Sequence, residues 1–255
     1  MSWDPTVYSA FLGPRTRPAA DLCANVVLSK VDSIIDVGCG PGNSTEVLAA
    51  RWPGASVLGI DSSVAMIDRA RAMGPAGARW QVADAGTFEP DAPVDVVFSN
   101  ATFQWLAGHE VLFPRVLGWV RPGGVLAVQM PRNFGAPSHV LLREVAARPR
   151  FRDRLAGVLR TEPVHRPEWY YRTLSDLASL DLWETEYLHV LDGADPVLEW
   201  VSGTALVPVR DALPDAEYDA FRAEYGAALR EAYPRGLDGQ TLFPFRRLFL
   251  VATPR

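Results

Sequence analysis

The amino-acid sequence predicts an α/β protein built on a doubly wound, mostly parallel sheet. Over the first half of the chain, short apolar runs rich in β-branched residues alternate with segments whose apolar residues recur at helical spacing. Such alternation is typical of a parallel sheet covered by helices on both faces. With 255 residues, 48% of them apolar, the chain can bury a full core. We therefore expect a single domain over residues 1–255.

Seven apolar runs have the length and composition of strands. They span residues 33–37, 56–60, 78–84, 94–100, 124–130, 182–191 and 242–252. Helical periodicity predicts helices over 44–52, 63–73 and 109–120. A later helix carries Tyr218, Phe221, Tyr225 and Leu229 on one stripe, which we interpret as core packing.

The chain changes character after about residue 148. Stretches rich in Arg and Pro, interrupted by aromatic residues, indicate a surface excursion rather than a linker. We divide the domain into an N-terminal segment (1–30), a core (31–131), insertions around a late strand (132–241) and a last strand (242–255). The insertions are expected to form a helical cap.

Composition excludes several classes of protein. The formal net charge of −5 argues against binding to nucleic acid or to an anionic membrane. The longest apolar stretches are strand-sized, and the first ten residues lack the features of a signal peptide. Cys23 and Cys39 offer neither metal-ligand spacing nor a disulfide framework, and no metal is expected. We predict a cytoplasmic protein that is a monomer.

The stretch "IIDVGCGPGN", residues 34–43, follows the first predicted strand and opens a helix. Glycines at such a place let the backbone take positive φ and let a ligand approach the main chain. Gly38, Gly40 and Gly42 give G-x-G-x-G rather than the G-x-G-x-x-G of dinucleotide sites. The nearby Asp36 suits a pyrophosphate poorly and suits a cofactor that bears an ammonium group. The alternative is a tight structural turn.

Two further acids follow the next strands. Asp61 ends the second strand, where an acid typically accepts from ribose hydroxyls, although a helix N-cap is the alternative and Ser62 and Ser63 compete for it. Asp84 closes the third strand, where it could accept from an exocyclic amine or simply lie in a surface loop. Together with Asp36, these acids predict a ligand at the carboxyl edge of the sheet.

The motifs "DVGCGPGNST", "GIDSSVAMI" and "ADAGTF" resemble those of Rossmann-type S-adenosylmethionine-dependent methyltransferases. The stretches "MSWDPTVYSAF", "RPAADL", "SNATFQWL", "LAVQMP" and "PFRRLFLVA" resemble, over essentially the whole chain, the trans-aconitate 2-methyltransferase family. This resemblance implies a Rossmann-like fold with an antiparallel last strand. It also implies monomethyl esterification of trans-aconitate, a small tricarboxylate, with release of S-adenosylhomocysteine.

The resemblance also implies the cofactor-binding residues. Asp36, Gly38 and Gly40 would face the methionine part, and Asp61 the ribose. Ser62 and Met66 would contact the adenosine, and Asp84 and Ala85 would lie at the adenine edge. Asn100 would lie near the sulfonium. Tyr8 and Arg17 of the N-terminal segment would fold over the cofactor, with Arg17 meeting its carboxylate.

The acid substrate asks for positioning rather than for a general base. A carboxylate has a pKa of about 4 and is already a nucleophile at neutral pH, so we assign no catalytic residue. Its other carboxylates need cationic or donor partners. Gln104 and Trp105 are expected to position the substrate. The other candidates that could form a roof over it are Arg132, Asn133, His139, Tyr170, Tyr171, Arg172, Trp200, Arg246 and Arg247.

These candidates could equally be surface charges and packing residues. Arg246 and Arg247 point to opposite faces of their strand, so only one can face the pocket, and we assign Arg246. His109, His189 and Cys39 are interpreted as structural.

Other functions share parts of this pattern. A methyltransferase for another small acid or small molecule is the nearest alternative. A nicotinamide oxidoreductase would share the fold but not the glycine spacing or Asp36. A nucleic-acid methyltransferase is disfavoured because "SNATF" lacks the two prolines of the base-amine motif. A non-catalytic binding module would leave a complete cofactor edge unexplained.

Overall fold

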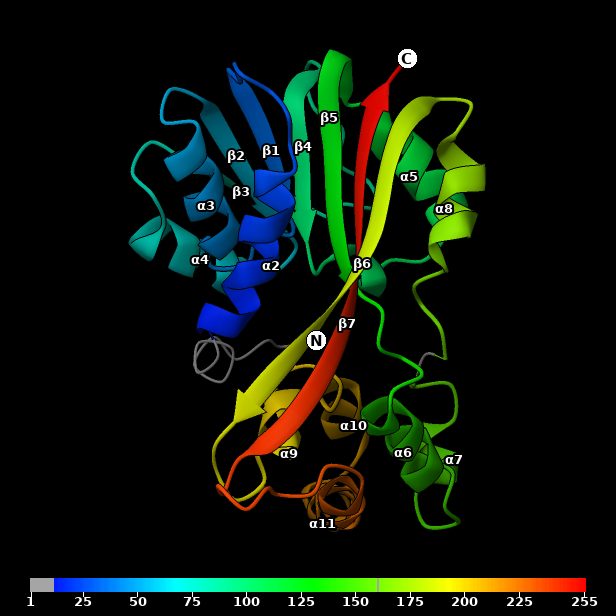
Figure 1. The fold of residues 1–255 in the computed structure, drawn as a ribbon. Coiled ribbons are helices and arrows are strands. Elements are labelled where there is room, and N and C mark those ends of the chain that lie inside the picture. Colours follow the sequence, from blue (N-terminus) through cyan, green and yellow to red (C-terminus); the bar gives the residue numbers. More distant parts are fainter. Residues whose placement is uncertain (1–11, 160) are drawn as a thin grey trace. The chain divides into compact units, whose positions relative to one another are not determined.

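The computed structural model describes residues 12–159 and 161–255, and its centre is a seven-stranded sheet of order β3-β2-β1-β4-β5-β7-β6 (Figure 1). Strands β1 to β5 are parallel to their neighbours, and β7 runs antiparallel to β5. The predicted fold class, including the antiparallel last strand, is confirmed. The strands are β1 Ser33–Val37, β2 Ser56–Asp61, β3 Arg79–Val82, β4 Val94–Asn100, β5 Val120–Pro131, β6 Ala178–Leu191 and β7 Thr241–Pro254.

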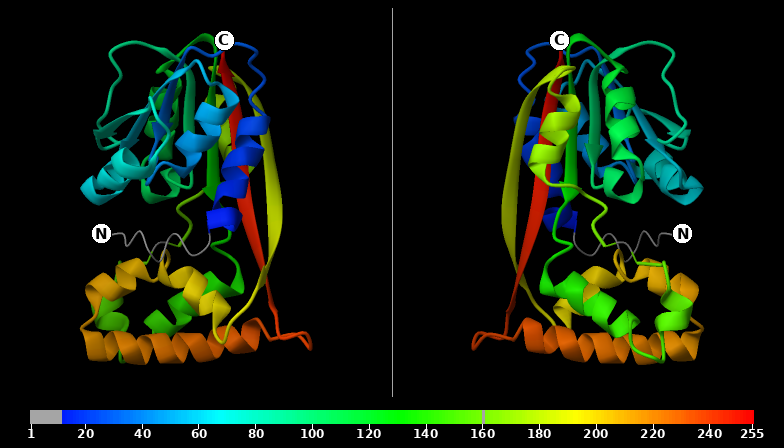
Figure 2. Two further views of the ribbon diagram at one scale, coloured as in Figure 1. Left: turned by 90° about the vertical axis from the view of Figure 1, so that its left-hand side faces the viewer. Right: turned by 90° about the vertical axis from the view of Figure 1, so that its right-hand side faces the viewer.

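Helices cover both faces of the sheet. On one face lie α2 (Leu12–Ala24), α3 (Asn43–Arg51) and α4 (Val64–Met73), and on the other lie α5 (His109–Leu117) and α8 (Pro167–Leu174) (Figures 1 and 2). A single turn of 3-10 helix, η1 (Phe103–Trp105), follows β4. This double covering explains why β1 and β4 are buried almost throughout.

Strand β5 begins earlier than its apolar run predicts. Val120 already pairs with Val94, and the register then shifts before Val96 pairs with Val125. The exposed residues 121–123, which lie between the predicted helix and the predicted strand, form a bulge within β5. For the same reason, the helix predicted to reach residue 120 ends at Leu117.

The chain divides into two compact units. The sheet unit contains Leu12–Pro131, Pro163–Thr185 and Arg247–Arg255. The helical unit contains, among the described residues, 132–159, 161–162 and Glu186–Arg246. Its start at Arg132 coincides with the predicted start of the insertions, whereas residues 163–185 return to the sheet unit. Its helices are α6 (Pro137–Ala146), α7 (Arg152–Leu155), α9 (Pro196–Ser202), α10 (Val207–Ala212) and α11 (Asp215–Ala232).

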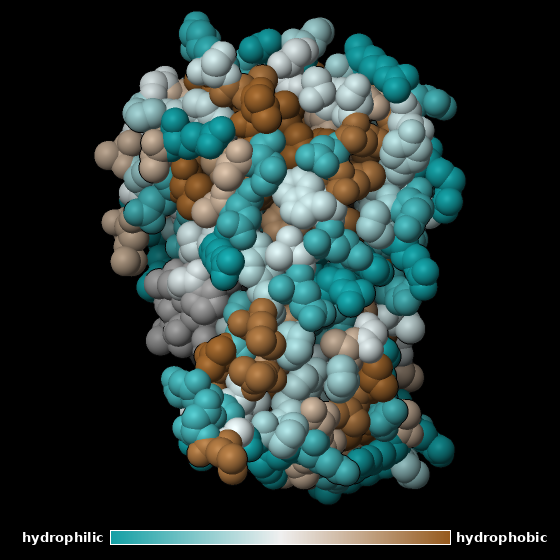
Figure 3. Space-filling view, viewed as in Figure 1, coloured by the Kyte–Doolittle hydropathy of each residue, from teal (hydrophilic) through white to brown (hydrophobic). Residues whose placement is uncertain are grey.

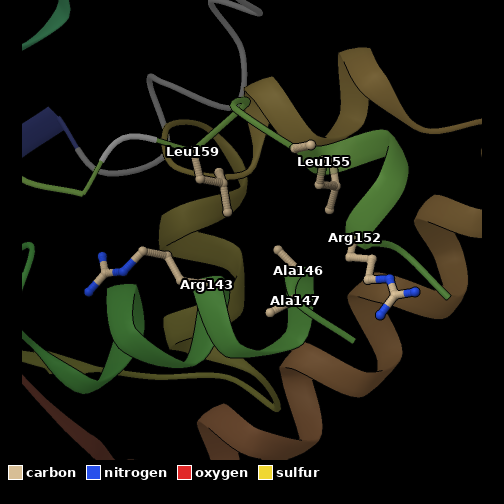
Figure 4. Close-up of a pocket in the computed structure, with 7 residues that line it drawn as sticks. Arg143, Ala146, Ala147, Arg152, Leu155 and Leu159 are labelled. Atoms are coloured by element: carbon tan, nitrogen blue, oxygen red, sulfur yellow. The ribbon is translucent and has the colours of Figure 1, made fainter. Parts of the chain in front are cut away.

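The helical unit has its own apolar core, centred on α11. The stripe predicted for this helix is buried and belongs to the core, as expected. Beside the core, Figure 4 shows a small apolar pocket between α6 and α7, in which the guanidinium groups of Arg143 and Arg152 point outward.

The surface seen in Figure 3 mixes polar and apolar side chains. Exposed apolar residues of the helical unit include Leu188 and Val190 on β6 and Leu242 on β7. None of the helices within residues 12–159 and 161–255 is long and apolar enough to span a bilayer.

Candidate active site

The glycine loop joins β1 to α3 and is anchored to the neighbouring strand. The backbone amides of Gly38 and Cys39 donate to the Ile60 carbonyl at 2.8 and 3.0 Å. Gly38 and Gly40 have φ of +70° and +55°, a region that disfavours side chains. A Cβ at Gly38 would lie 2.1 Å from Thr102 Oγ1, whereas one at Gly40 would meet no other atom of the described residues within 4 Å. Gly38 thus serves close packing, which Gly40 does not do within the described part of the chain.

Asp36 lies fully buried beneath this loop. Its Oδ2 accepts from Ser44 Oγ at 2.7 Å and from Thr45 Oγ1 at 2.6 Å. Its Oδ1 is buried and has no hydrogen-bond partner among the described residues. Burial raises the pKa of this carboxyl to about 6, against the opposing effect of the two hydroxyls. The unsatisfied oxygen is a ready acceptor for a cationic group.

Asp61 ties the glycine loop to the next helix. Its Oδ2 accepts from the Gly40 amide at 3.0 Å, and its Oδ1 accepts from the Ser63 amide at 2.8 Å. Burial raises its pKa, and these two hydrogen bonds oppose the shift. The N-cap of α4 is Ser63, which accepts from the Met66 amide. Ser62 is exposed and Met66 is buried.

The loop after β3 is held by Asp84, which the sequence analysis named, and by Arg115, which it did not. Asp84 is exposed and accepts from the Gly86 amide at 2.7 Å, while Ala85 is buried. Arg115 of α5 donates to the carbonyls of Ala85 and Phe88 and to Glu89 Oε1. The partners of Arg115 lie 26 to 30 residues away in the sequence, so no local motif predicts these hydrogen bonds.

A strained turn follows β4 at the same edge of the sheet. Ala101 has φ of +56°, rare for a residue with a side chain. Its amide donates to the Gln129 carbonyl at 2.9 Å, and its carbonyl accepts from Gln104 Nε2 at 2.6 Å. The buried Oδ1 of the preceding Asn100 has no hydrogen-bond partner among the described residues.

Strand register places a row of polar residues on one face of the sheet. Asp36 pairs with Phe98, and Asn100, two residues further on, therefore faces the same side and pairs with Gln129. Gln129 in turn pairs with Phe249, two residues after Arg247. Gln129 is fully buried, and its Oε1 accepts from Arg247 Nη1 at 3.4 Å. We call Asp36, Asn100, Gln129 and Arg247 the polar row.

The remaining candidates of the sheet unit lie in different environments. Gln104 is buried and Trp105 is half-buried in η1. Tyr170 is fully buried, with its hydroxyl 2.7 Å from His109 Nδ1, so it forms part of the interior. Tyr171 and Arg172 are exposed. Arg17 is exposed with its Nε 3.7 Å from Asp21 Oδ2, and Tyr8 lies outside the described residues.

Among the candidates of the helical unit, Trp200 is a core residue. It is buried against His189, with ring centroids 4.5 Å apart. The Arg132 amide donates to the Arg246 carbonyl. Asn133 is buried, and neither polar atom of its side chain has a hydrogen-bond partner among the described residues. Burial lowers the pKa of His139 to about 4, with a smaller contribution from Arg143.

The two adjacent arginines of β7 differ as strand alternation predicts. Arg246, the one assigned to the substrate, is exposed and lies 3.6 Å from Glu186. Arg247 is only 4% exposed. The sequence specified the alternation but not which of the two arginines faces inward, because apolar residues border both.

Two residues interpreted as structural have structural contacts. His109 is buried, and its Nε2 donates to the Phe103 carbonyl while its Nδ1 faces Tyr170. Cys39 is buried in the glycine loop, and burial raises the pKa of its thiol.

Comparisons with known proteins agree with this geometry. The family model described as "Methyltransferase domain" matches residues 34–124. The computed structure is similar to that of the YcgJ protein from Bacillus subtilis, with a TM-score of 0.61 and 12% identity, covering 94% of this chain and 99% of that one. It is also similar to phosphoethanolamine N-methyltransferase 2 of Haemonchus contortus in complex with S-adenosylmethionine, with a TM-score of 0.56 and 16% identity over 94% of this chain and 53% of that one.

Sequence relatives are much closer. The chain is 47% identical over 252 residues to trans-aconitate 2-methyltransferase of Azoarcus sp. (strain BH72), covering 98% of both chains. It is 49% identical over 260 residues to the enzyme of that name from Streptomyces avermitilis, covering 98% of this chain and 96% of that one. With identity near one half along almost the full length of both partners, the chain belongs to the trans-aconitate 2-methyltransferase family.

Proposed function

We propose that this protein transfers a methyl group from S-adenosylmethionine to a carboxylate of trans-aconitate, giving the monomethyl ester and S-adenosylhomocysteine. Family membership supports both the donor and the acid. The single observation of the structure that carries the proposal is the pair of unsatisfied, buried oxygens, Asp36 Oδ1 and Asn100 Oδ1, on one face at the carboxyl edge of the sheet.

The residues of this edge fit the methyl donor. Asp36 Oδ1 and Asn100 Oδ1 are acceptors without donors, and the donor carries an ammonium and a sulfonium. A Cβ at Gly40 would meet no atom of the described residues, and Asp61 holds the loop and keeps acceptor capacity for ribose hydroxyls. Arg115 holds the carbonyl of Ala85, which would position the backbone of Asp84 and Ala85 for contact with adenine. When bound, S-adenosylmethionine supplies an electrophilic methyl group.

Transfer to a carboxylate needs no proton movement. A carboxylate oxygen forms the new bond to the methyl carbon, and the carbon–sulfur bond breaks with its electron pair remaining on sulfur. Opposite charges are neutralised, so a site that excludes water favours the reaction. The contribution of the protein is alignment, which can supply up to about 7–11 kcal/mol. We assign that alignment in part to Gln104 and Trp105, which follow the strained turn at Ala101.

The proposal extends to the setting of the enzyme. Both cysteines are buried and unpaired, which supports a reducing compartment such as the cytoplasm. We also infer that the enzyme acts as a monomer.

Methyl transfer scanned across small di- and tricarboxylic acids tests the proposed activity. We expect trans-aconitate to have the highest kcat/KM of the panel. Preference for another acid would replace the substrate and keep the reaction. In a parallel thermal-shift experiment, S-adenosylhomocysteine should stabilise the protein and NAD should not. Stabilisation by NAD alone would refute the methyltransferase assignment.

Asp61→Ala tests the cofactor edge. Because Asp61 holds the Gly40 loop and accepts from the ribose in this proposal, the variant should bind S-adenosylhomocysteine about 1–3 kcal/mol more weakly. Isothermal calorimetry measures the change. Asp68→Ala, which removes an exposed carboxylate paired with Arg71 on α4, is the matched control and should bind normally. Equal affinity of Asp61→Ala and wild type for S-adenosylhomocysteine would show that Asp61 does not contribute to cofactor binding.

A further inference from the structure

We propose that His109 is a positioning residue for methyl transfer, because it holds the turn that carries Gln104 and Trp105. This inference rests on the proposed function, in which those two residues align the acid substrate. The turn spans residues 101–105, from the strained Ala101 to the end of η1. It directly follows the residue of the polar row that ends β4.

The turn needs support from outside, because its backbone is strained. The φ of +56° at Ala101 can persist only where surrounding contacts enforce it. On the side of the sheet, the Ala101 amide donates to the Gln129 carbonyl at 2.9 Å, and Thr102 Oγ1 donates to the Gly38 carbonyl at 3.2 Å. Both of these contacts hold the beginning of the turn, and neither reaches the 3-10 helix that follows.

His109 holds the end of the turn. Its Nε2 lies 2.8 Å from the carbonyl oxygen of Phe103, which also accepts from the Leu106 amide at 3.0 Å and so closes η1. A carbonyl only accepts hydrogen bonds, so Nε2 carries the proton and donates. His109 is buried at the start of α5, so the donor belongs to an element outside the turn.

Tyr170 of α8 fixes the orientation of this imidazole. With the proton on Nε2, Nδ1 of the neutral ring is an acceptor, and the Tyr170 hydroxyl donates to it at 2.7 Å. The hydroxyl oxygen itself accepts from the His165 amide at 3.3 Å. The hydrogen bonds therefore run in one direction, from the backbone before α8 through Tyr170 and His109 to the Phe103 carbonyl.

Packing alone does not require these hydrogen bonds. The ring of Phe113 packs against those of Phe103, His109 and Tyr170, with centroids 4.9 to 5.4 Å apart. Apolar side chains at positions 109 and 170 could fill the same space without a buried polar network, which is costly unless its members are satisfied. The polar atoms add direction, because they end on the backbone oxygen of the residue before Gln104. A displacement there would misalign the acid.

Two substitutions of His109 separate positioning from stability. His109→Leu removes both nitrogens, whereas His109→Gln loses the contact with Tyr170 but keeps an amide donor for the Phe103 carbonyl. With both substrates saturating, kcat should fall about tenfold in His109→Leu and stay within about threefold of wild type in His109→Gln. Equal values of kcat in the two variants would refute the positioning role.

Cofactor affinity provides the control for folding. Calorimetry should show S-adenosylhomocysteine binding within about twofold of wild type in both variants, because Asp36 and Asp61 are untouched, and it reports that the sheet unit is folded. A loss of affinity as large as the loss of kcat would show a general structural defect and refute the inference.

Tyr170→Phe keeps the ring packing and gives the answer if His109→Leu does not fold. It frees the imidazole to reorient, so kcat should fall about threefold or more. Thr173→Val is the matched control, because it removes a hydroxyl of the same helix whose hydrogen bond to the Trp169 carbonyl stays within α8. If Tyr170→Phe has the kcat of wild type, or if Thr173→Val loses as much, the inference is refuted.

Amide hydrogen exchange tests the support of the turn without relying on activity. Amides of residues 101–106 should exchange about tenfold faster or more in His109→Leu and Tyr170→Phe than in wild type, while those of β1 and β2 should not change. Unchanged exchange in the turn, or faster exchange with the kcat of wild type, would refute the inference and leave the methyltransferase assignment intact. Absence of wild-type turnover with any small acid would instead refute the proposed function.

Discussion

Asp36 shows how a single residue can be unfavourable for folding and useful for binding. Its pKa rises from 3.8 to about 6 because the carboxyl group is fully buried. Between pH 3.8 and about 6, Asp36 is mostly ionised in the unfolded chain and mostly protonated in the folded protein. The stability that protonation provides is complete below about pH 4 and is lost as the pH rises through 6. An ammonium group bound at Oδ1 would restore favourable electrostatics to the ionised form.

Asp36→Asn should abolish this dependence. An amide keeps an oxygen for the hydroxyls of Ser44 and Thr45 and never ionises. At about 1.4 kcal/mol per pKa unit, the free energy of unfolding of the variant should gain about 2 kcal/mol relative to wild type between about pH 4.5 and 7.5. Denaturant titrations at both pH values measure it. A constant difference between the two proteins would show that Asp36 titrates normally.

The sequence predicted those features of the candidate site that depend on local backbone. The positive φ of Gly38 and Gly40 and the position of Asp61 at a strand end could be predicted because each depends on residues close by in the sequence. Thr102, Arg115 and Gln129 were not predicted in this way. Each acts on a partner distant in sequence: Thr102 on the Gly38 carbonyl, Arg115 on the Ala85 loop and Gln129 on Arg247. Only the register of the folded sheet brings such partners together.

At the scale of elements, two hydrogen bonds at Ser138 connect α6 to α11 and to Tyr233, the residue after it. Tyr225 on the buried stripe of α11 donates from its hydroxyl to the Ser138 carbonyl at 2.7 Å, and the Ser138 amide donates to the Tyr233 hydroxyl at 3.0 Å. The apolar period predicted the stripe correctly. It carried no information about the partner of the hydroxyl, since a tyrosine and a phenylalanine satisfy the same pattern.

Tyr225→Phe should therefore destabilise the protein although it keeps the ring. Loss of the hydroxyl leaves the buried carbonyl of Ser138 without this donor. We expect the free energy of unfolding to decrease by about 1–3 kcal/mol. Urea titration followed by circular dichroism measures it. Tyr218→Phe, on the same helix at a position 7% exposed, is the control and should change stability by less than about 0.5 kcal/mol. Equal effects of the two substitutions would show that the hydrogen bond to Ser138 does not contribute to stability.

Considered as a whole, the molecule has no imidazole suited to act as a base at neutral pH in the described part of the site. His139 has a pKa of about 4, and both nitrogens of His109 are engaged. Burial raises the pKa of Asp36 at the candidate site to about 6, close to the working range. Since the ionised form of Asp36 would receive the ammonium, it should influence binding of the donor rather than the transfer step.

The pH dependence of the two kinetic parameters should consequently differ. With both substrates saturating, kcat should be flat from about pH 6 to 8.5, because the acid is already ionised. The kcat/KM for S-adenosylmethionine should fall as the pH drops below about 6, where Asp36 becomes protonated. Initial rates in overlapping buffers give both profiles. A limb in kcat near pH 7 would reveal a base, and Asp36→Asn should remove the limb in kcat/KM.

The order of the strands has a consequence for folding during synthesis of the chain. β7 is the last strand to be synthesised, yet it lies between β5 and β6, inside the sheet. Until Thr241–Pro254 leaves the ribosome, the backbone edge of β5 has no neighbour on that side, and such edges invite pairing with other chains. The two units share β7, so neither can be completed early. A nascent chain of this topology is therefore exposed to aggregation for most of its synthesis, and it closes its sheet in one late, long-range step.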